Sequence, residues 1–252
     1  MFDDFRALTV TEREDRLIVE LTRPEVRNAI DDVMVTELHS VCAHLEREPK
    51  ILVITGCEHD GRGIFASGAD IAQLKERRRD DALRGINNTI FQRIASLPMP
   101  VIAAIDGYAL GGGLELALAA DFRIATEKAK FGQPEAGLGI IAAAGGLWRI
   151  KALIGEAIAK EILLAGRILS GEEAFEVHLV TELAKPEELL DAAHAFADRI
   201  AALDPLAVRV SKTLMAMPTE AHPTVDNIAQ AILFESDAKF ERMQAFLDRK
   251  KK

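Results

Sequence analysis

Glu115 is a glutamate in surroundings where a charge is costly, and such a residue is a candidate for acid–base chemistry. Between Ile102 and Ala120 the only charged residues are Asp106, which stands beside a glycine in a turn, and Glu115. The neighbours of Glu115 are leucines and alanines, a pattern typical of a helix that is buried on all sides. Burial of a carboxylate is costly and raises its pKa. We interpret Glu115 as a catalytic acid or base; the alternative is a structural acid paired within the core.

Glu135 is a second candidate. It follows Phe131–Pro134, and the stretch Ile140–Gly146 downstream contains neither a charge nor a side-chain hydrogen-bond donor. A carboxylate beside such an apolar wall could transfer a proton, although a carboxylate in an ordinary turn or at a helix start would look the same. If the two glutamates share a site, their environments should separate their pKa values, so that one acts as acid and the other as base.

Two glycine-rich segments could supply backbone hydrogen-bond donors to this chemistry. They span 63–71 and 107–115, and each leads into a predicted helix. The first N–H groups of a helix have no partner within the helix, and small residues let a ligand approach them closely. Two such segments facing each other could form an oxyanion hole, or the glycines could serve only tight turns. Neither segment has the spacing of a dinucleotide-binding or ATPase phosphate loop.

Several other classes of function find no support. The net charge of −9 and pI of about 5.3 argue against nucleic-acid binding, which needs a basic surface. We expect no membrane span, because no run of 18 apolar residues occurs. The six histidines are scattered, and Cys42 and Cys57 lack metal-ligand spacing, so no metal site is predicted. Reduced cysteines and an acidic N-terminus without a signal peptide favour a cytoplasmic protein.

The elements that must position these residues alternate between strands and helices as far as about residue 145, and the remainder reads as helical. This predicts an α/β core followed by an α-helical part. Expected strands are 17–21, 51–55, 101–105, 122–125 and 130–132; expected helices are 31–48, 71–79, 80–97 and 111–120. The stretch 58–68 reads as irregular, and helix breaks are expected at several glycines and prolines, among them Gly155.

Together these motifs resemble the crotonase superfamily, in particular the enoyl-CoA hydratase/isomerase group. The matching blocks are 23–24 with 28–29, 65–70, 107–117, 131–135 and 234–237 with Phe246. The resemblance implies a crotonase-like spiral of ββα units over residues 1–195 that carries the CoA and catalytic site. It also implies a C-terminal α-helical trimerisation region over 196–252 and a homotrimer or a dimer of trimers.

The resemblance also assigns roles to individual residues. It implies that the backbone N–H groups of Ala69 and Gly112 form the oxyanion hole for the thioester carbonyl. Glu115 would help activate water for attack at C3, and Glu135 would protonate C2. The acyl-CoA substrate would be bound by a third group: Arg27, Ala66, Ser67, Gly68, Asp70, Ile71 and Phe246.

The implied activity is hydration of a 2-enoyl-CoA, as in fatty acid β-oxidation. No cofactor is expected, since coenzyme A is part of the substrate. The alternatives are a Δ3,Δ2-enoyl-CoA isomerase, which can work with one base at the Glu135 position, and an acyl-CoA-binding homologue with weak catalysis.

Two positions depart from the family pattern. Ala72 stands where hydratases often carry lysine, so Lys75, or Arg249 of a neighbouring subunit, is expected to meet the CoA phosphates. Ala142-Ala143 replace a Pro-Gly pair, and the N–H of Ala143 is expected to hold water in a space that its methyl narrows. The wall near Ile86–Phe91 and Trp148 is expected to set acyl-chain length.

Overall fold

The computed structural model describes residues 2–249. These residues form two compact units, with the boundary in the chain between Ala197 and Asp198. This boundary and the one predicted between residues 195 and 196 both fall within helix α8 (Leu189–Ala201).

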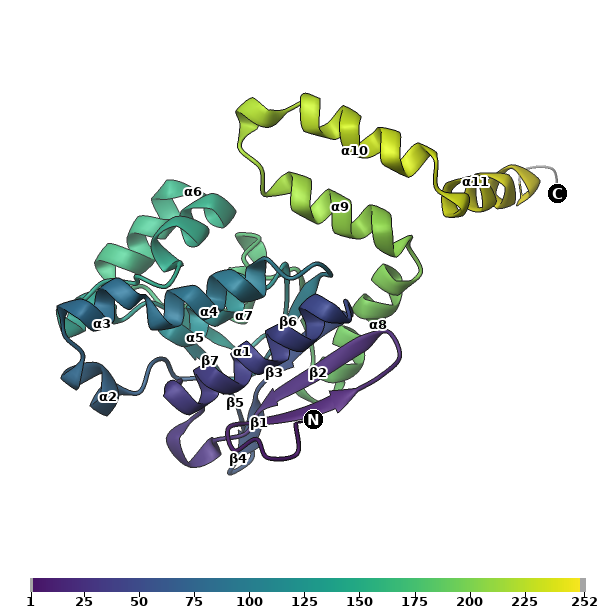
Figure 1. Ribbon diagram of the computed structural model, residues 1–252. Helices are drawn as coiled ribbons and strands as arrows, with labels where there is room; N and C mark the ends of the chain where they lie inside the picture. Colours follow the sequence, from purple (N-terminus) through teal and green to yellow (C-terminus); the bar gives the residue numbers. More distant parts are fainter. Residues whose placement is uncertain (1, 250–252) are drawn as a thin grey trace. The chain divides into compact units, whose positions relative to one another are not determined.

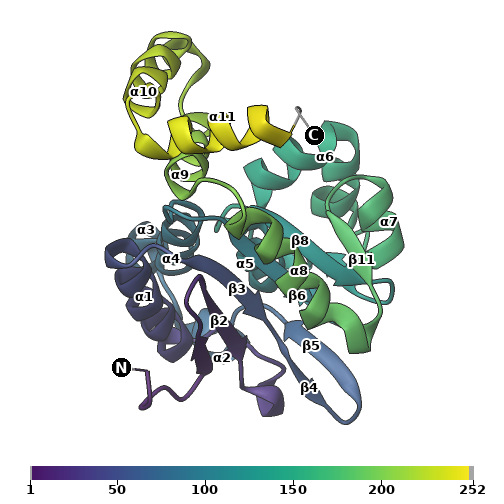
Figure 2. The same ribbon diagram turned by 90° about the vertical axis from the view of Figure 1, so that its right-hand side faces the viewer.

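The first unit is built on two β-sheets (Figures 1 and 2). The six-stranded sheet has the order β1-β2-β3-β6-β8-β11, and the five-stranded sheet has the order β10-β9-β7-β5-β4. Strands of the first sheet are β1 (Leu8–Glu12), β2 (Arg16–Leu21), β3 (Ile51–Thr55), β6 (Val101–Ile105), β8 (Phe122–Thr126) and β11 (Glu182–Ala184). Strands of the second are β4 (Cys57–His59), β5 (Arg62–Ala66), β7 (Tyr108–Leu110), β9 (Lys130–Gly132) and β10 (Leu169–Ser170).

Successive pairs of strands contribute one member to each sheet, which is the ββα spiral that the sequence predicts. β3, β6 and β8 pair in parallel in the first sheet, and β5, β7 and β9 pair in parallel in the second. A short turn joins β6 to β7, and another joins β8 to β9, so that the chain crosses from the first sheet to the second each time. Helix α5 (Gly112–Ala119) follows β7 directly. The predicted α/β fold with a helical C-terminal part is confirmed.

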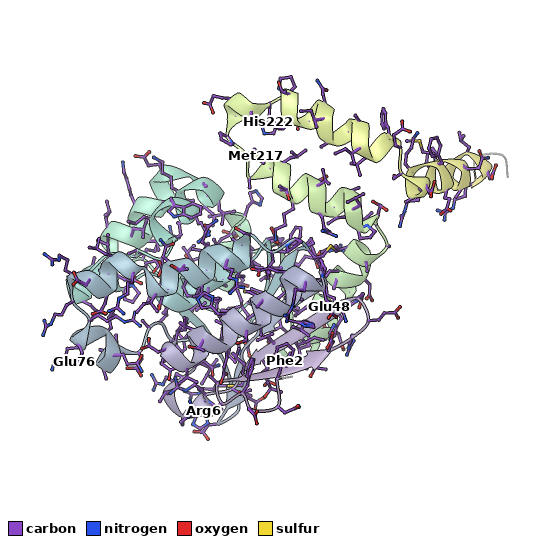
Figure 3. All side chains as sticks on the ribbon, in the orientation of Figure 1. Phe2, Arg6, Glu48, Glu76, Met217 and His222 are labelled. Carbon is purple, nitrogen blue, oxygen red and sulfur yellow. The ribbon has the colours of Figure 1, made fainter. Side chains whose placement is uncertain are left out.

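Helices cover these sheets, and α1 (Asp32–Arg47) packs beside α4 (Ile86–Ala95) (Figure 1). Every residue of α5 is buried, as its apolar sequence predicts. The remaining helices of the first unit are α2 (Ile71–Glu76), α3 (Arg79–Arg84), α6 (Gly146–Ala165) and α7 (Gly171–Glu176). Glu76 marks the end of α2 on the outside of the fold (Figure 3). The predicted break at Gly155 is present as a kink inside α6, where φ is 79°.

Several short elements differ from the prediction. The stretch expected to be irregular contains β4 and β5, and β1, β7, β10 and β11 were not expected. The helix expected over 80–97 is two helices, because Gly85 adopts a left-handed conformation with φ of 61° between α3 and α4. β7, β10 and β11 pair only with strands distant in sequence, which local patterns do not reveal.

The second unit consists of α9 (Pro205–Met215), α10 (Thr224–Phe234) and α11 (Asp237–Arg249). Met217 and His222 lie in the connection between α9 and α10 (Figure 3), and Nδ1 of His222 is 2.7 Å from Oδ2 of Asp226. Its helices expose large apolar side chains, including Ile232 and Phe246. Trimerisation through this unit stays a prediction. Among the described residues, no helix is long and apolar enough to cross a membrane.

Candidate active site

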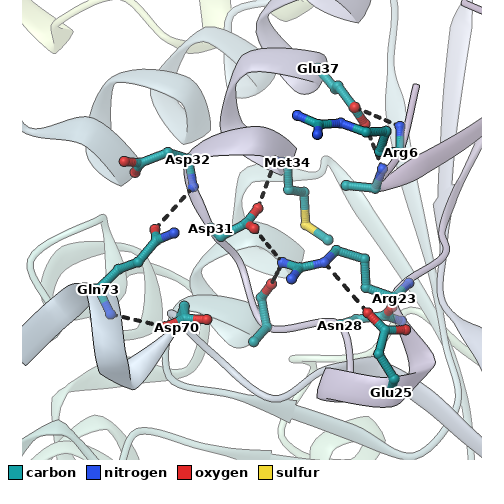
Figure 4. A network of polar contacts seen from close by, with 12 residues as sticks. Arg6, Arg23, Glu25, Asn28, Asp31, Asp32, Met34, Glu37, Asp70 and Gln73 are labelled. Atoms are coloured by element: carbon teal, nitrogen blue, oxygen red, sulfur yellow. Dashed lines mark hydrogen bonds and ion pairs between the residues drawn. The ribbon is translucent and has the colours of Figure 1, made fainter. Parts of the chain in front are cut away.

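Arg23, Asn28 and Asp31 belong to a polar network (Figure 4), and Asn28 joins this network to the end of β5. The side-chain oxygen of Asn28 accepts from the N–H of Arg23 at 2.7 Å, and its amide nitrogen donates to the carbonyls of Ile64 and Phe65, both at 3.0 Å. Arg23 is also ion-paired with Asp31 at 2.6 Å. Because Asn28 is fully buried, these bonds fix the backbone that leads into the first glycine-rich segment.

The backbone N–H of Ala69 is turned toward open space by a short β-bridge. The N–H of Ile30 donates to the carbonyl of Gly68 at 2.8 Å, and the N–H of Asp70 donates to the carbonyl of Ile30 at 3.0 Å. In this parallel pattern the residue between the two bonded positions, Ala69, points its own N–H away from the bridge. Gly68 has φ of 117°, a conformation that glycine adopts without steric cost.

Gly112 supplies a second N–H beside that of Ala69. It is the first residue of α5, so its N–H has no acceptor within the helix. A Cβ atom on Gly112 would lie 3.3 Å from the nitrogen of Ala69, and one on Gly113 would lie 2.1 Å from the carbonyl oxygen of Ala66. The glycines therefore let the start of α5 approach β5 closely, and the two amides border one small volume.

Glu115 is held by backbone donors. Its Oε1 accepts from the N–H of Ala144 at 2.7 Å and from the N–H of Gly146 at 3.0 Å. The expected role of Ala143 in holding water is not supported, because its N–H donates to the carbonyl of Ile141 at 2.8 Å. The segment after Ala143 thus positions the glutamate through the amides of Ala144 and Gly146.

Burial and hydrogen bonding act in opposite directions on Glu115. Its side chain is buried, and this desolvation raises its pKa above the ordinary value. The N–H groups of Gly146 and Ala144, together with the charge of Arg149, oppose the shift by stabilising the carboxylate. Arg149 is itself buried; its guanidinium donates to Gln92 at 3.0 Å and stacks 4.1 Å from the ring centre of Trp148.

Glu135 lies at the start of a short 3-10 helix (Glu135–Leu138) after β9. Burial raises the pKa of Glu135 to about 7, and the negative charge of Glu115 adds to the shift. In the orientation of the Gln133 amide that satisfies its neighbours, the nitrogen donates to Oε2 of Glu135 at 2.8 Å and to Oε1 at 2.9 Å. A Cβ on Gly111 would lie 2.9 Å from Oε1, so this glycine leaves room for the carboxyl group.

One cavity of about 740 Å³ brings these groups together, a volume in the range of small-molecule sites. Its wall includes Ala69, Gly112, Glu115 and Glu135, the four residues assigned to catalysis from the sequence. Ser67, Gly68 and Ile71, assigned to substrate binding, also line it. Much of the remaining wall is aliphatic: Leu74, Ile86, Leu138, Ile140 and Ile141.

Other residues assigned to substrate binding do not line this cavity. Arg27 accepts a hydrogen bond from the N–H of Ser67 through its carbonyl at 3.0 Å, and Ala66 is buried in the core. Asp70 caps α2 by accepting from the N–H of Gln73 at 2.9 Å (Figure 4). Phe246 belongs to the second unit. The roles of these residues in binding stay predictions.

The cations that line the cavity do not include Lys75, and the expected contact from Arg249 of a neighbouring subunit stays a prediction. Lys75 is exposed outside the cavity, whereas Arg77, Arg78 and Arg79 line it. Arg77 is 3.1 Å from Asp32 and Arg79 is 3.1 Å from the neighbouring Asp80. Arg78 has no ion pair among residues 2–249, so its charge is free for an anionic ligand.

The predicted chain-length wall is only partly present. Ile86 and Asn87 line the cavity, but Phe91 is fully buried in the core. Trp148 does not line the cavity and packs on Arg149 instead.

Three features of the site were missed from the sequence: Gln133, Asn87 and the amides of residues 144 and 146. Gln133 directly precedes a proline and a glutamate, and the position of Asn87 opposite Gly112 depends on the packing of α4. The run of small residues around 144–146 indicates backbone donors, but it does not distinguish the amide of Ala143 from those of Ala144 and Gly146.

Two backbone donors and two buried carboxylates on one cavity define a class of protein: enzymes of the ββα-spiral fold that act beside a stabilised oxyanion. Comparison with known proteins agrees. The sequence model of the enoyl-CoA hydratase/isomerase family matches residues 13–252, and the chain belongs to this family.

Individual relatives cover nearly the whole chain. A crotonyl-CoA hydratase of Syntrophomonas wolfei is 36% identical over 251 residues, covering 96% of this chain and 95% of the relative. A short-chain-enoyl-CoA hydratase of Clostridium acetobutylicum is 34% identical over 256 residues, with the same coverage of 96% and 95%. The crystal structure of an enoyl-CoA hydratase from Bacillus anthracis superposes with a TM-score of 0.90 at 30% identity, covering 97% of each chain.

Proposed function

We propose that this protein is a hydro-lyase that adds water across the 2,3 double bond of a 2-enoyl-CoA thioester. The observation that carries the proposal is the placement of Glu115 and Glu135 on the same cavity as the N–H groups of Ala69 and Gly112. The relatives named as hydratases of crotonyl-CoA and short-chain enoyl-CoA support the same reaction.

The oxyanion hole supplies the electrostatic part of catalysis. The thioester oxygen accepts from Ala69 and Gly112, which withdraws electrons from the double bond and makes C3 electrophilic. As water attacks C3, negative charge moves to this oxygen and an enolate forms. One such donor contributes on the order of 3–4 kcal/mol to the transition state. The two N–H groups are fixed by the Ile30 bridge and by the start of α5, so they need not reorganise during the reaction.

The two glutamates divide the proton transfers. Glu115, whose Oε1 is bound by two backbone N–H groups, is the better stabilised carboxylate and accepts a proton from the attacking water. Glu135, with its pKa raised to about 7, is protonated in a large fraction of molecules at neutral pH and donates to C2 of the enolate. Water thus supplies the hydroxyl at C3 and leaves its proton on Glu115, while the proton of Glu135 enters at C2. Loss of a proton from Glu115 to solvent and uptake of one by Glu135 then restore the starting state, so the net reaction adds one water.

The remaining cavity suits an acyl-CoA. Aliphatic residues including Ile86, Leu138 and Ile141 provide an apolar wall for the acyl chain, and Arg78 is a cation for the phosphates. The reaction needs no cofactor, since coenzyme A arrives as part of the substrate. The proposed assembly, a trimer or a dimer of trimers, would form through the second unit.

Loss of the conjugated enoyl-thioester absorbance on incubation with crotonyl-CoA tests the proposal. We expect rapid loss with the wild-type protein, and a reduction of about 10²–10⁴-fold for Glu115→Gln and for Glu135→Gln. Exposed Glu176 provides the matched control, and Glu176→Gln should retain wild-type turnover. Absence of turnover by the wild type, or turnover that is indifferent to both active-site substitutions, would refute hydration.

The same variants separate hydration from double-bond migration. A Δ3,Δ2-enoyl-CoA isomerase needs one base at the Glu135 position, so it would convert a 3-enoyl-CoA normally after Glu115→Gln. If Glu115→Gln abolishes hydration and isomerisation to the same extent, the two glutamates act as one unit in both reactions. If the wild type isomerises but does not hydrate, the hydratase proposal is wrong.

A further inference from the structure

Asn87 presents a polar side chain to the cavity that the two-glutamate mechanism does not use. It lies in the first turn of α4 and lines the cavity. Its Oδ1 is buried and has no hydrogen-bond partner among the described residues. A buried polar atom without a partner costs roughly 1–3 kcal/mol, and such atoms in native proteins call for an explanation.

The other end of this carboxamide lies at the oxyanion hole. A Cβ atom built on Gly112 would be 3.7 Å from Nδ2 of Asn87 and 3.3 Å from the backbone nitrogen of Ala69. The nitrogens of Ala69, Gly112 and Asn87 therefore surround one small volume. This volume is where the proposed function places the thioester oxygen.

We propose that the Nδ2 group of Asn87 is a third hydrogen-bond donor for the thioester oxygen, which makes Asn87 a catalytic residue. The inference rests on the proposed function, because the oxygen is that of an acyl thioester. A side-chain N–H group beside a developing oxyanion stabilises it by the same electrostatic effect as the backbone donors. Nδ2 makes no hydrogen bond to another residue within 2–249, so no contact with the described part of the protein competes with donation to the substrate.

The geometry also explains the choice of side chain at this position. Asparagine offers a neutral donor, so binding of the substrate does not have to remove water from a charged side chain at this position. A carboxylate of the same size would place negative charge against the enolate oxygen. The substitution Asn87→Asp therefore reverses the interaction while it conserves shape, and Asn87→Ser retains a shorter donor if larger changes disturb the fold.

The kinetic test compares Asn87→Ala, Asn87→Ser and Asn87→Asp with the wild type in crotonyl-CoA hydration. We expect kcat to fall on the order of 10²-fold for Asn87→Ala, as for loss of one oxyanion-hole donor. The fall should be smaller for Asn87→Ser and larger for Asn87→Asp. Thr89→Asp is the matched control, because Thr89 is exposed in the same helix turn and lies outside the cavity; it should behave as wild type.

A spectroscopic measurement separates a donor from a merely structural residue. Butyryl-CoA labelled with ¹³C at the thioester carbonyl is saturated and does not react, and its carbonyl stretch shifts to lower frequency when donors polarise the bond. We expect Asn87→Ala and Asn87→Ser to lose part of the shift that the wild type produces, with Thr89→Asp retaining all of it.

The outcomes distinguish this inference from the proposed function. An unchanged carbonyl frequency in both Asn87→Ala and Asn87→Ser, or wild-type kcat in Asn87→Asp, would overturn the third donor while hydration stands. A wild-type protein that binds butyryl-CoA with a shifted carbonyl but does not hydrate crotonyl-CoA would refute hydration. In that case the carbonyl shift of the Asn87 variants still decides the role of this side chain.

Discussion

Replacement of Glu135 by glutamine should stabilise the folded protein at alkaline pH and leave its stability at acidic pH nearly unchanged. The pKa of Glu135 is about 7 in the folded protein, against 4.5 for the unperturbed group. The folded state therefore holds a proton on Glu135 over a pH range in which the unfolded chain has lost it. Stability falls with rising pH wherever the folded state binds more protons.

The size of the effect follows from this difference in pKa. Below pH 4.5 both states are protonated and burial of the carboxyl carries no charge penalty. Above pH 7 both are ionised, and the folded state bears the full cost of the buried charge. At about 1.4 kcal/mol per pKa unit, the difference between 4.5 and about 7 corresponds to roughly 3 kcal/mol. Glutamine has the same shape and no charge, so Glu135→Gln removes this cost.

Urea unfolding at about pH 5 and about pH 8 measures the difference. We expect the free energy of unfolding of Glu135→Gln to exceed that of the wild type by up to about 3 kcal/mol at the higher pH, and by much less at the lower. Protein concentration is held constant, because any assembly of subunits adds to apparent stability. Glu176→Gln, an exposed substitution, should track the wild type. A Glu135→Gln variant that parallels the wild type at both pH values would show that Glu135 does not carry a raised pKa.

Three further predictions concern activity. For the wild type, kcat/KM for hydration should fall above about pH 7, because Glu135 must be protonated in the free enzyme. A profile of kcat/KM that stays flat to about pH 9 would contradict the assignment of Glu135 as the acid. Gly112→Ala should lower kcat by about 10²–10³-fold, because its methyl would lie 3.3 Å from the nitrogen of Ala69 and occupy the proposed oxyanion hole. Unchanged kcat would place the thioester oxygen elsewhere. Arg78→Glu should raise KM for crotonyl-CoA about fivefold, the equivalent of ~1 kcal/mol. It should leave KM for crotonyl-pantetheine unchanged, because that thioester lacks the phosphates that Arg78 is proposed to contact. Equal effects on the KM of both thioesters would exclude Arg78 as the phosphate contact.

Where the structure places residues singled out from the sequence on the cavity, the signal was a conflict within a local pattern. Glu115 stands alone in a helix whose other residues are apolar, and a charge in that setting needs a functional or structural reason. The same helix begins with consecutive glycines, which disfavour a helix unless close packing requires them. In the structure Gly113 lies against the carbonyl of Ala66, and this contact supplies the reason. Strands β3 and β6 were predictable because continuous β-branched and apolar runs indicate burial on both faces.

Where the prediction failed, the determining contacts join residues distant in sequence. β5 and β7 are short and contain glycine or alanine, and they exist as strands because each pairs with a neighbour in the second sheet. Nothing in the sequence near Asn87 marks it, since its significance comes from the packing of α4 against the start of α5. The amide that faces Glu115 is that of Ala144 and not of Ala143, because a loop of small residues does not indicate which of its amides faces inward.

The proposed opposite roles of the two glutamates follow from the groups that replace water around each carboxylate. Both are buried, and burial alone would raise the pKa of both. At Glu115, two backbone N–H groups replace part of the lost hydration, and the nearby charge of Arg149 favours the carboxylate further. Glu135 accepts hydrogen bonds from its own backbone N–H and from the Gln133 amide, but no cation among the described residues opposes its burial, and burial together with the charge of Glu115 raises its pKa. Ionisation of Glu115 therefore promotes protonation of Glu135, and the pair tends to hold a single proton. That state, with a base at one carboxylate and an acid at the other, is the one that hydration requires.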